Sequence, residues 1–256
     1  MHEAVKGSCD VYFYEMANRL GIERYNEMLE SCGLGQFFDI GLPYPRRAEG
    51  LVPGPAWKRA RRNEPWTTGD TFNVGIGQGA LLSSPLQLAV MTARIATGRR
   101  VIPTLSPVSG ASPEFESMGW TAEHLSEVNR AMSGVVNEPG GSAYWPLQTR
   151  GIDLEGIQMA GKTGTSQVYS ISAEERAAGL RDQEDLPWRL RNHGLFVCYA
   201  PVAAPRYAVT VVLEHGIGGT RAAVPAQAIL RDLVRRDPSN TRPDMYASAA
   251  RPVTEG

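Results

Sequence analysis

The chain has 256 residues, of which 42% are hydrophobic, and its formal net charge at pH 7 is −1. This length suits one large domain or two small ones, and the composition is that of a globular protein with a sizeable core. The balanced charge argues against a general affinity for nucleic acid or acidic membranes, and the sequence lacks the run of roughly 18 apolar residues that a membrane span requires.

The beginning of the chain, MHEAVKGSCD, lacks the apolar core segment of a signal peptide. The first predicted element is a helix over residues 11–33, because apolar side chains recur along it at helical spacing. Its pattern is broken near Gly21, and Gly33 and Gly35 are typical of its end. The three cysteines, Cys9, Cys32 and Cys198, show no CxxC spacing, so we expect isolated thiols.

A long irregular stretch is predicted between Leu34 and Thr71, because it contains five prolines and many glycines. A loop of this length usually carries function or covers a surface. It contains the basic run KRARR, Lys58 to Arg62. We expect that run to lie in a solvated loop, because a nucleic-acid surface would also carry repeated aromatic residues.

Two helices are predicted next, over residues 84–98 and 121–136. In the first, Ser84 is a good N-cap and Pro85 occupies the first helical position. In the second, Glu123 in the first turn suits the helix dipole. The following segment, NEPGGSAY, has the composition of a turn.

Three strands are predicted over residues 157–169, 193–201 and 207–215. Only VAAPR separates the second from the third, so these two should form an antiparallel hairpin. Their nearly continuous apolar runs indicate burial on both faces. A last helix is predicted over residues 222–235, with a basic final turn.

The segment AGKTGTSQVY, Ala160 to Tyr169, matches two motifs that bind different ligands. With the residues before it, it completes GIQMAGKT, which fits the phosphate-binding pattern GxxxxGK[ST]. That pattern works only where a helix follows the lysine, so that its first amides hold a phosphate. Gly164 and the β-branched residues after it instead favour a strand. Nucleotide binding is therefore the less favoured interpretation.

The second motif is Lys-Thr-Gly on a strand, which penicillin-binding proteins and β-lactamases combine with Ser-x-x-Lys and a Ser-x-Asn type of motif. Alternation along a strand lets Lys162 point into a cleft. Gly164 leaves room for a ligand backbone to pair with the strand edge, and the N–H of Thr165 can donate to an oxyanion. Three residues alone are a weak signal, so the neighbouring segments decide.

Four further segments occur in a fixed order around this strand: SCD at residues 8–10, GIGQG at 75–79, GGSA at 140–143 and HGLFVCYAP at 193–201. Together with PAWKRARRNEPWTTGDTFNVGIGQG, they resemble the transpeptidase domain of class B penicillin-binding proteins, of the elongation-specific penicillin-binding protein 2 type. The resemblance extends from Glu3 to about Arg235.

The resemblance implies an α/β fold, a partial sandwich of the penicillin-binding-protein and serine β-lactamase type, with an antiparallel sheet flanked by helices. No serine in the sequence is followed three positions later by lysine, so the nucleophile motif is absent. We therefore expect the C-terminal part of a transpeptidase domain, without its first strands, nucleophile helix and membrane anchor. Residues 1–236 would form this part and 237–256 a disordered tail.

The resemblance also assigns roles. Ser8 would relay a proton to the leaving amine with the help of Lys162, and Asp10 would position the lysine of the absent motif or the substrate's amide. Thr163 and Thr165 would hydrogen-bond the terminal carboxylate of the substrate beside Gly164. Each residue also has a purely structural alternative, such as a helix cap for Ser8.

Three alternatives to a transpeptidase part stay open at the level of the sequence. They are a P-loop nucleotide-binding protein, an unusual hydrolase in which Ser8 itself is the nucleophile and Lys162 its base, and a non-catalytic truncated product. No cofactor is implied. Metal binding is not expected, because His2, Cys9 and Asp10 have no recognisable ligand spacing.

The implied reaction is D,D-transpeptidation of peptidoglycan stem peptides during cell-wall elongation and maintenance of rod shape. The expected partners are stem peptides, β-lactams and the elongation machinery, with no nucleic acid. The expected location of the full-length parent is the periplasmic side of the bacterial inner membrane.

Overall fold

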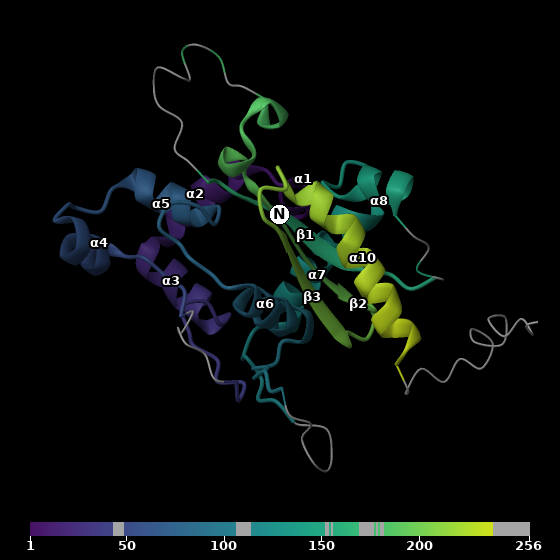
Figure 1. Cartoon of the computed structure of the whole chain (residues 1–256). Helices are drawn as coiled ribbons and strands as arrows, with labels where there is room; N and C mark the ends of the chain where they lie inside the picture. Colours follow the sequence, from purple (N-terminus) through teal and green to yellow (C-terminus); the bar gives the residue numbers. More distant parts are fainter. Residues whose placement is uncertain are drawn as a thin grey trace, which may run out of the picture.

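The computed structural model describes residues 1–42, 49–105, 114–151, 154, 156–168, 177, 179 and 182–237. Figure 1 shows a small sheet with helices around it. The helices described are α1 (His2–Gly7), α2 (Asp10–Leu20), α3 (Ile22–Ser31), α4 (Pro55–Arg62), α5 (Thr68–Gly75), α6 (Pro85–Thr97), α7 (Ala122–Asn137), α8 (Tyr144–Arg150) and α10 (Gly219–Arg235). Two short 3-10 helices, Gln183–Asp185 and Trp188–Leu190, precede the second strand.

The sheet has three antiparallel strands in the order β1-β2-β3, with β1 Ala160–Ser166, β2 His193–Ala200 and β3 Tyr207–Leu213. Lys162 lies opposite Val197, and Leu195 opposite Val212. The predicted hairpin is confirmed, although each strand is shorter than its apolar pattern suggested. The α/β class with an antiparallel sheet is confirmed as well.

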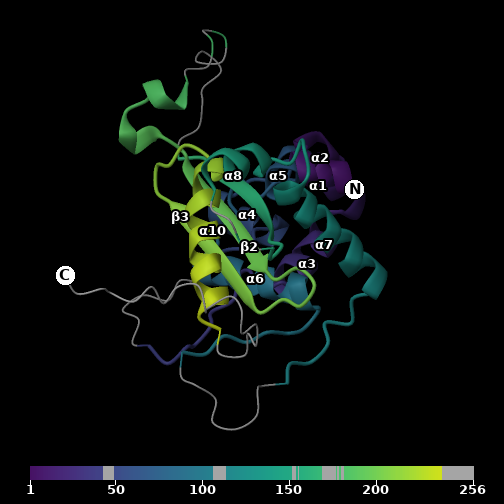
Figure 2. The same ribbon diagram turned by 90° about the vertical axis from the view of Figure 1, so that its right-hand side faces the viewer.

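Both faces of β2 are buried, as its continuous apolar sequence predicted. Phe196 and Cys198 belong to the core cluster that includes Ala222, Ala226 and other residues of α10. Tyr199 points to the opposite face, where it packs against residues of α6 and α7. Figure 2 shows α10 and α7 on opposite sides of β2. Helices therefore cover the sheet on both faces, as the resemblance implied.

The predicted helix over residues 11–33 is divided into α2 and α3 at Gly21, whose φ is 78°. A further helix, α1, precedes them and was not predicted. Ser8 follows α1 in the left-handed conformation with φ 57°, and Cys9 is the N-cap of α2. The helix α2 therefore begins at Asp10, within the SCD segment and one residue before the predicted start.

The stretch from Leu34 to Thr71 is less irregular than predicted, because it contains α4 and the start of α5. The basic run is helical, and Lys58 is 7% exposed rather than solvated. Its ammonium contacts the Asp70 carboxylate at 2.7 Å, while Asp70 and Thr67 form the capping box of α5. Sequence patterns missed these helices because specific cap and ion-pair contacts stabilise them, rather than long apolar stripes.

The helices predicted over 84–98 and 121–136 are confirmed as α6 and α7, with Ser84 accepting the cap hydrogen bond at the start of α6. The helix predicted over 222–235 begins three residues earlier, at Gly219. The short α8 was not predicted. Asp237, assigned to the disordered tail, is buried and bonds to Arg206 at 3.2 Å, whereas residues 238–256 lie outside the described part of the chain.

Within the described residues, we find no helix that combines the length and the apolar character needed to cross a membrane.

Candidate active site

Lys162 lies near the middle of β1, and its side chain reaches the turn that follows α1. Its ammonium donates to the Ser8 hydroxyl at 2.8 Å and to the Thr163 carbonyl oxygen at 3.0 Å. Burial lowers the pKa of Lys162 to about 8, and the negative charge of Asp10 opposes this shift only in part. A lysine with this pKa can gain or lose a proton near neutral pH.

Ser8 occupies the turn between α1 and α2, and its hydroxyl meets Lys162 rather than a helix N-terminus. The left-handed backbone of Ser8 directs the chain from one helix into the next. The structural alternative of a helix N-cap is wrong, because Cys9 holds the N-cap position of α2, whereas Ser8 is the C-cap of α1 through its backbone. The Ser8–Lys162 distance of 2.8 Å is within the reach that a proton relay requires.

Asp10 is the first residue of α2 and is exposed. Its charge acts on Lys162 through space, which favours the protonated amine. The structure thus brings Lys162 close to Ser8 and Asp10, although it lies more than 150 positions further along the sequence.

Thr163 points to the opposite face from Lys162, as alternation along a strand requires. Its hydroxyl lies 2.7 Å from the hydroxyl of Ser142, which belongs to the GGSA segment. The N–H of Ser142 in turn donates to the carbonyl of Lys6 at 3.0 Å, on α1. The GGSA segment therefore connects β1 to α1, the helix that precedes Ser8. Sequence reasoning had not assigned a role to Ser142.

Gln78, from the GIGQG segment, contacts β1 close to Thr165. Its side-chain nitrogen donates to the Thr165 carbonyl oxygen at 2.5 Å. The flanking Gly77 and Gly79 have φ of 78° and 73°, a conformation that glycine adopts without strain. Only the tertiary structure shows that this glycine-rich segment ends on the site strand.

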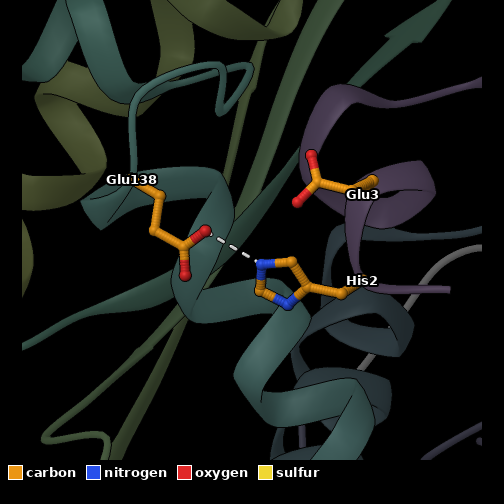
Figure 3. Close-up of side chains that lie close together, drawn as sticks. All are labelled: His2, Glu3 and Glu138. Atoms are coloured by element: carbon orange, nitrogen blue, oxygen red, sulfur yellow. Dashed lines mark hydrogen bonds and ion pairs between the residues drawn. The ribbon is translucent and has the colours of Figure 1, made fainter.

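A cluster of charged residues fastens α1 to the end of α7. Nε2 of His2 lies 2.9 Å from a carboxylate oxygen of Glu138, and Figure 3 shows the two side chains directed at each other with Glu3 nearby. The three residues could present ligand atoms within 4.8 Å of one another. However, the Lys6 ammonium contacts Glu3 at 2.9 Å and Glu138 at 3.4 Å. A cation of the protein therefore already balances these carboxylates.

The phosphate-binding interpretation of GIQMAGKT does not fit this geometry. Lys162 and Thr163 lie inside β1, which continues to Ser166. Because the residues directly after the lysine continue the strand instead of starting a helix, the amides that a P-loop directs at phosphate are not arranged here.

The fold and the Lys-Thr-Gly edge strand define the class of penicillin-binding transpeptidase domains. Penicillin-binding protein PBP2 of Helicobacter pylori, solved in complex with MreC, superposes with a TM-score of 0.73 at 31% identity, over 91% of this chain and 40% of that one. PBP2 of Pseudomonas aeruginosa in complex with WCK 5153 gives a TM-score of 0.70 at 30% identity, over 91% of this chain and 46% of that one.

This chain belongs to the family described as the penicillin binding protein transpeptidase domain, whose sequence model matches residues 1–235. The peptidoglycan D,D-transpeptidase MrdA of Acinetobacter baumannii is 38% identical over 239 residues, which cover 90% of this chain and 34% of that protein. The chain thus spans about a third of the length of this curated relative. The elongation-type resemblance seen in the sequence is confirmed by these relatives.

Proposed function

We propose that this chain supplies the proton-relay and substrate-edge half of a peptidoglycan D,D-transpeptidase site. The observation that carries the proposal is the 2.8 Å hydrogen bond from Lys162 to Ser8. The lysine lies on β1 of a chain that belongs to the transpeptidase family. The printed sequence contains no Ser-x-x-Lys. The nucleophilic serine is therefore assigned to sequence upstream of residue 1, and the chain alone is expected to be inactive.

In the proposed reaction, the upstream serine attacks the penultimate D-alanine carbonyl of a stem peptide. The Ser8 hydroxyl passes a proton to the departing amine of D-alanine, and Lys162 replaces that proton. An acyl-enzyme results, and an amine of a neighbouring peptide takes the acyl group. The pKa of about 8 supports the role of Lys162, because both of its protonation states are populated near neutral pH.

The remaining proposed roles concern the substrate. The N–H of Thr165 donates to the oxyanion of the tetrahedral intermediate, and the Thr163 and Thr165 hydroxyls bind the terminal carboxylate of the stem peptide. Gly164 lets the substrate approach the strand, and Asp10 positions the lysine of the upstream motif or the amide of the substrate.

The wider setting is also a proposal. The relatives carry the names MrdA and PBP2, and one PBP2 structure contains MreC. These names support a role in cell-wall elongation and cell shape, β-lactams as inhibitors, and an elongation partner at the periplasmic face of the inner membrane. Residues 1–236 are proposed as the folded unit that takes part.

The test uses a labelled penicillin and intact-mass measurement on this chain and on a longer chain that adds an upstream Ser-x-x-Lys segment. We expect covalent labelling of the longer chain only, and slower labelling when Lys162 is replaced by alanine. A longer chain that folds but stays unlabelled would contradict the proposal. Labelling of the short chain at Ser8 would instead support the unusual hydrolase.

A further inference from the structure

The outer edge of β1 is the side of the strand that faces away from β2. In an antiparallel pair, the N–H and C=O of one residue point to the same side, and neighbouring residues point to opposite sides. Because the Thr165 carbonyl accepts from Gln78, residues Thr163, Thr165 and Gln167 face outward, whereas Gly164 and its alternate neighbours pair with β2. The Thr165 N–H therefore lies on the same edge as its carbonyl.

Gln78 occupies this edge in the way that a peptide group would. Its amide nitrogen donates to the Thr165 carbonyl at 2.5 Å, and its amide oxygen faces the N–H of Gln167 at 3.5 Å. The Thr165 carbonyl is one of the two groups that a residue of an added antiparallel strand would bond, the other being the Thr165 N–H. The carboxamide of glutamine has the same donor and acceptor as a peptide unit, so it can replace one.

The position of Gln78 is set by its own turn rather than by β1. Its backbone N–H donates to the Asn73 carbonyl at 2.8 Å, and glycines with positive φ flank it on both sides. The side chain alone reaches the strand, so it can leave the edge by rotation about its own bonds while the turn stays in place.

We propose that Gln78 is a placeholder for the backbone amide of the substrate on β1, and that an extended acyl donor must displace it. This inference rests on the proposed function. A donor whose reactive carbonyl oxygen lies at the Thr165 N–H has its own amide N–H facing the Thr165 carbonyl, because both groups share one edge. Gln78 and the substrate then compete for the same acceptor, and Gln78 lowers the apparent affinity of the site for peptide-like ligands.

The test compares Gln78→Ala with the parent in the longer chain that carries Ser-x-x-Lys. The measurements are the second-order rate constant of penicillin labelling, its saturation behaviour, and inhibition of labelling by a peptide that ends in D-Ala-D-Ala. Removing one competing hydrogen bond should raise the second-order constant and the peptide affinity about three- to ten-fold, with the rate constant at saturation unchanged. Gln36→Ala is the matched control, since Gln36 is exposed and, among the described residues, its side chain bonds to the Glu30 carbonyl rather than to the site.

Amide hydrogen exchange provides a readout that does not depend on the ligand. In Gln78→Ala, exchange should become faster at Gln167, while Gly164 and Ser166, which pair with β2, keep their protection. If those two amides also lose protection, Gln78 supports the strand and the placeholder role is wrong. Weaker labelling with an intact sheet would show that Gln78 binds the substrate instead, which also overturns the inference. An unlabelled parent would reject the proposed function itself, before any variant is compared.

Discussion

At the scale of single residues, the site depends on a serine with an uncommon backbone. Ser8 has φ 57°, which costs free energy for any residue other than glycine. Its hydroxyl takes part in the contact with Lys162 and in no helix cap. The sequence motif identified this serine, but the strained turn that presents it was visible only in the fold.

Replacing Ser8 separates its backbone role from its hydroxyl. Ser8→Gly should leave the free energy of unfolding equal or higher, because glycine relieves the left-handed strain. In a longer chain with the nucleophile, the same change should slow penicillin labelling about 100-fold or more, because the relay is lost. Denaturant unfolding and labelling kinetics provide the two measurements. Unchanged labelling would remove Ser8 from the proposed mechanism.

Lys162 should make stability depend on pH. Its pKa falls from 10.5 to about 8 on folding, so between these values the unfolded chain binds more protons than the folded one. The free energy of unfolding should therefore rise as the pH increases from 8 towards 10.5, by on the order of 1–3 kcal/mol. Below pH 8 the cost of burying the charged amine is fully present.

The measurement is urea unfolding of the parent and of Lys162→Met at several pH values. Other groups titrate in both proteins, so the difference between the two curves isolates Lys162. A difference that stays constant across this pH range would show that the lysine keeps its ordinary pKa in the folded chain.

At the scale of secondary-structure elements, the N-terminus of α10 packs directly on the site strand. A Cβ on Gly219 would lie 2.5 Å from the carbonyl oxygens of Gly164 and Leu195. A Cβ on Gly164 would meet its nearest atom, on Leu195, at an ordinary 3.6 Å. The glycine that permits close packing in this pair is therefore the one in the helix.

Two alanine substitutions test this assignment. Gly219→Ala should destabilise the protein by about 1–3 kcal/mol, because backbone atoms of two strands would have to move. Gly164→Ala should change the free energy of unfolding by less than about 1 kcal/mol, since its added methyl group meets no clash. The measurement is the denaturant midpoint at constant m-value. Equal effects of the two substitutions would contradict the assignment of the close packing to Gly219.

The link between α1 and α7 is expected to be sensitive to acid. Contacts with His2 and Lys6 lower the pKa of Glu138 below its usual value of 4.5. A lowered carboxylate pKa stabilises the fold above the unfolded pKa, and this contribution is lost as the pH falls through the folded value. Amides of α1 should exchange faster in Glu138→Gln than in the parent at pH 7. The two proteins should converge at acidic pH, where the parent's carboxylate is protonated.

At the scale of the whole molecule, the sheet has an exposed end. In the described part of the chain, β3 pairs with β2 on one side and has no strand on its other side. Unpaired strand edges favour aggregation. The printed chain alone should therefore form larger species in size-exclusion chromatography, and a longer chain with upstream family sequence should elute as a smaller, discrete species with higher thermal stability. A monomeric and equally stable short chain would contradict this expectation.

Much of the fold followed from local patterns, because α6 and α7 carry side-chain caps, the sequence of α10 is amphipathic, and the β2–β3 hairpin has nearly continuous apolar runs. Other elements did not. The helices α4 and α5 depend on the buried ion pair of Lys58 with Asp70, a contact that no apolar periodicity indicates. The short α1 depends in the same way on contacts with Glu138.

The sequence by itself determined the family and the strand that carries Lys162, and it disfavoured a phosphate loop, since motif order and strand propensity are local properties. Only the tertiary structure decided which groups meet Lys162, why its pKa falls and where Gln78 and Ser142 lie. The hydrogen bond between Lys162 and Ser8 joins residues 154 positions apart, and the one between Gln78 and Thr165 joins residues 87 positions apart. Such contacts form only when helices and sheet have packed, and the burial that lowers the pKa of Lys162 arises at the same step.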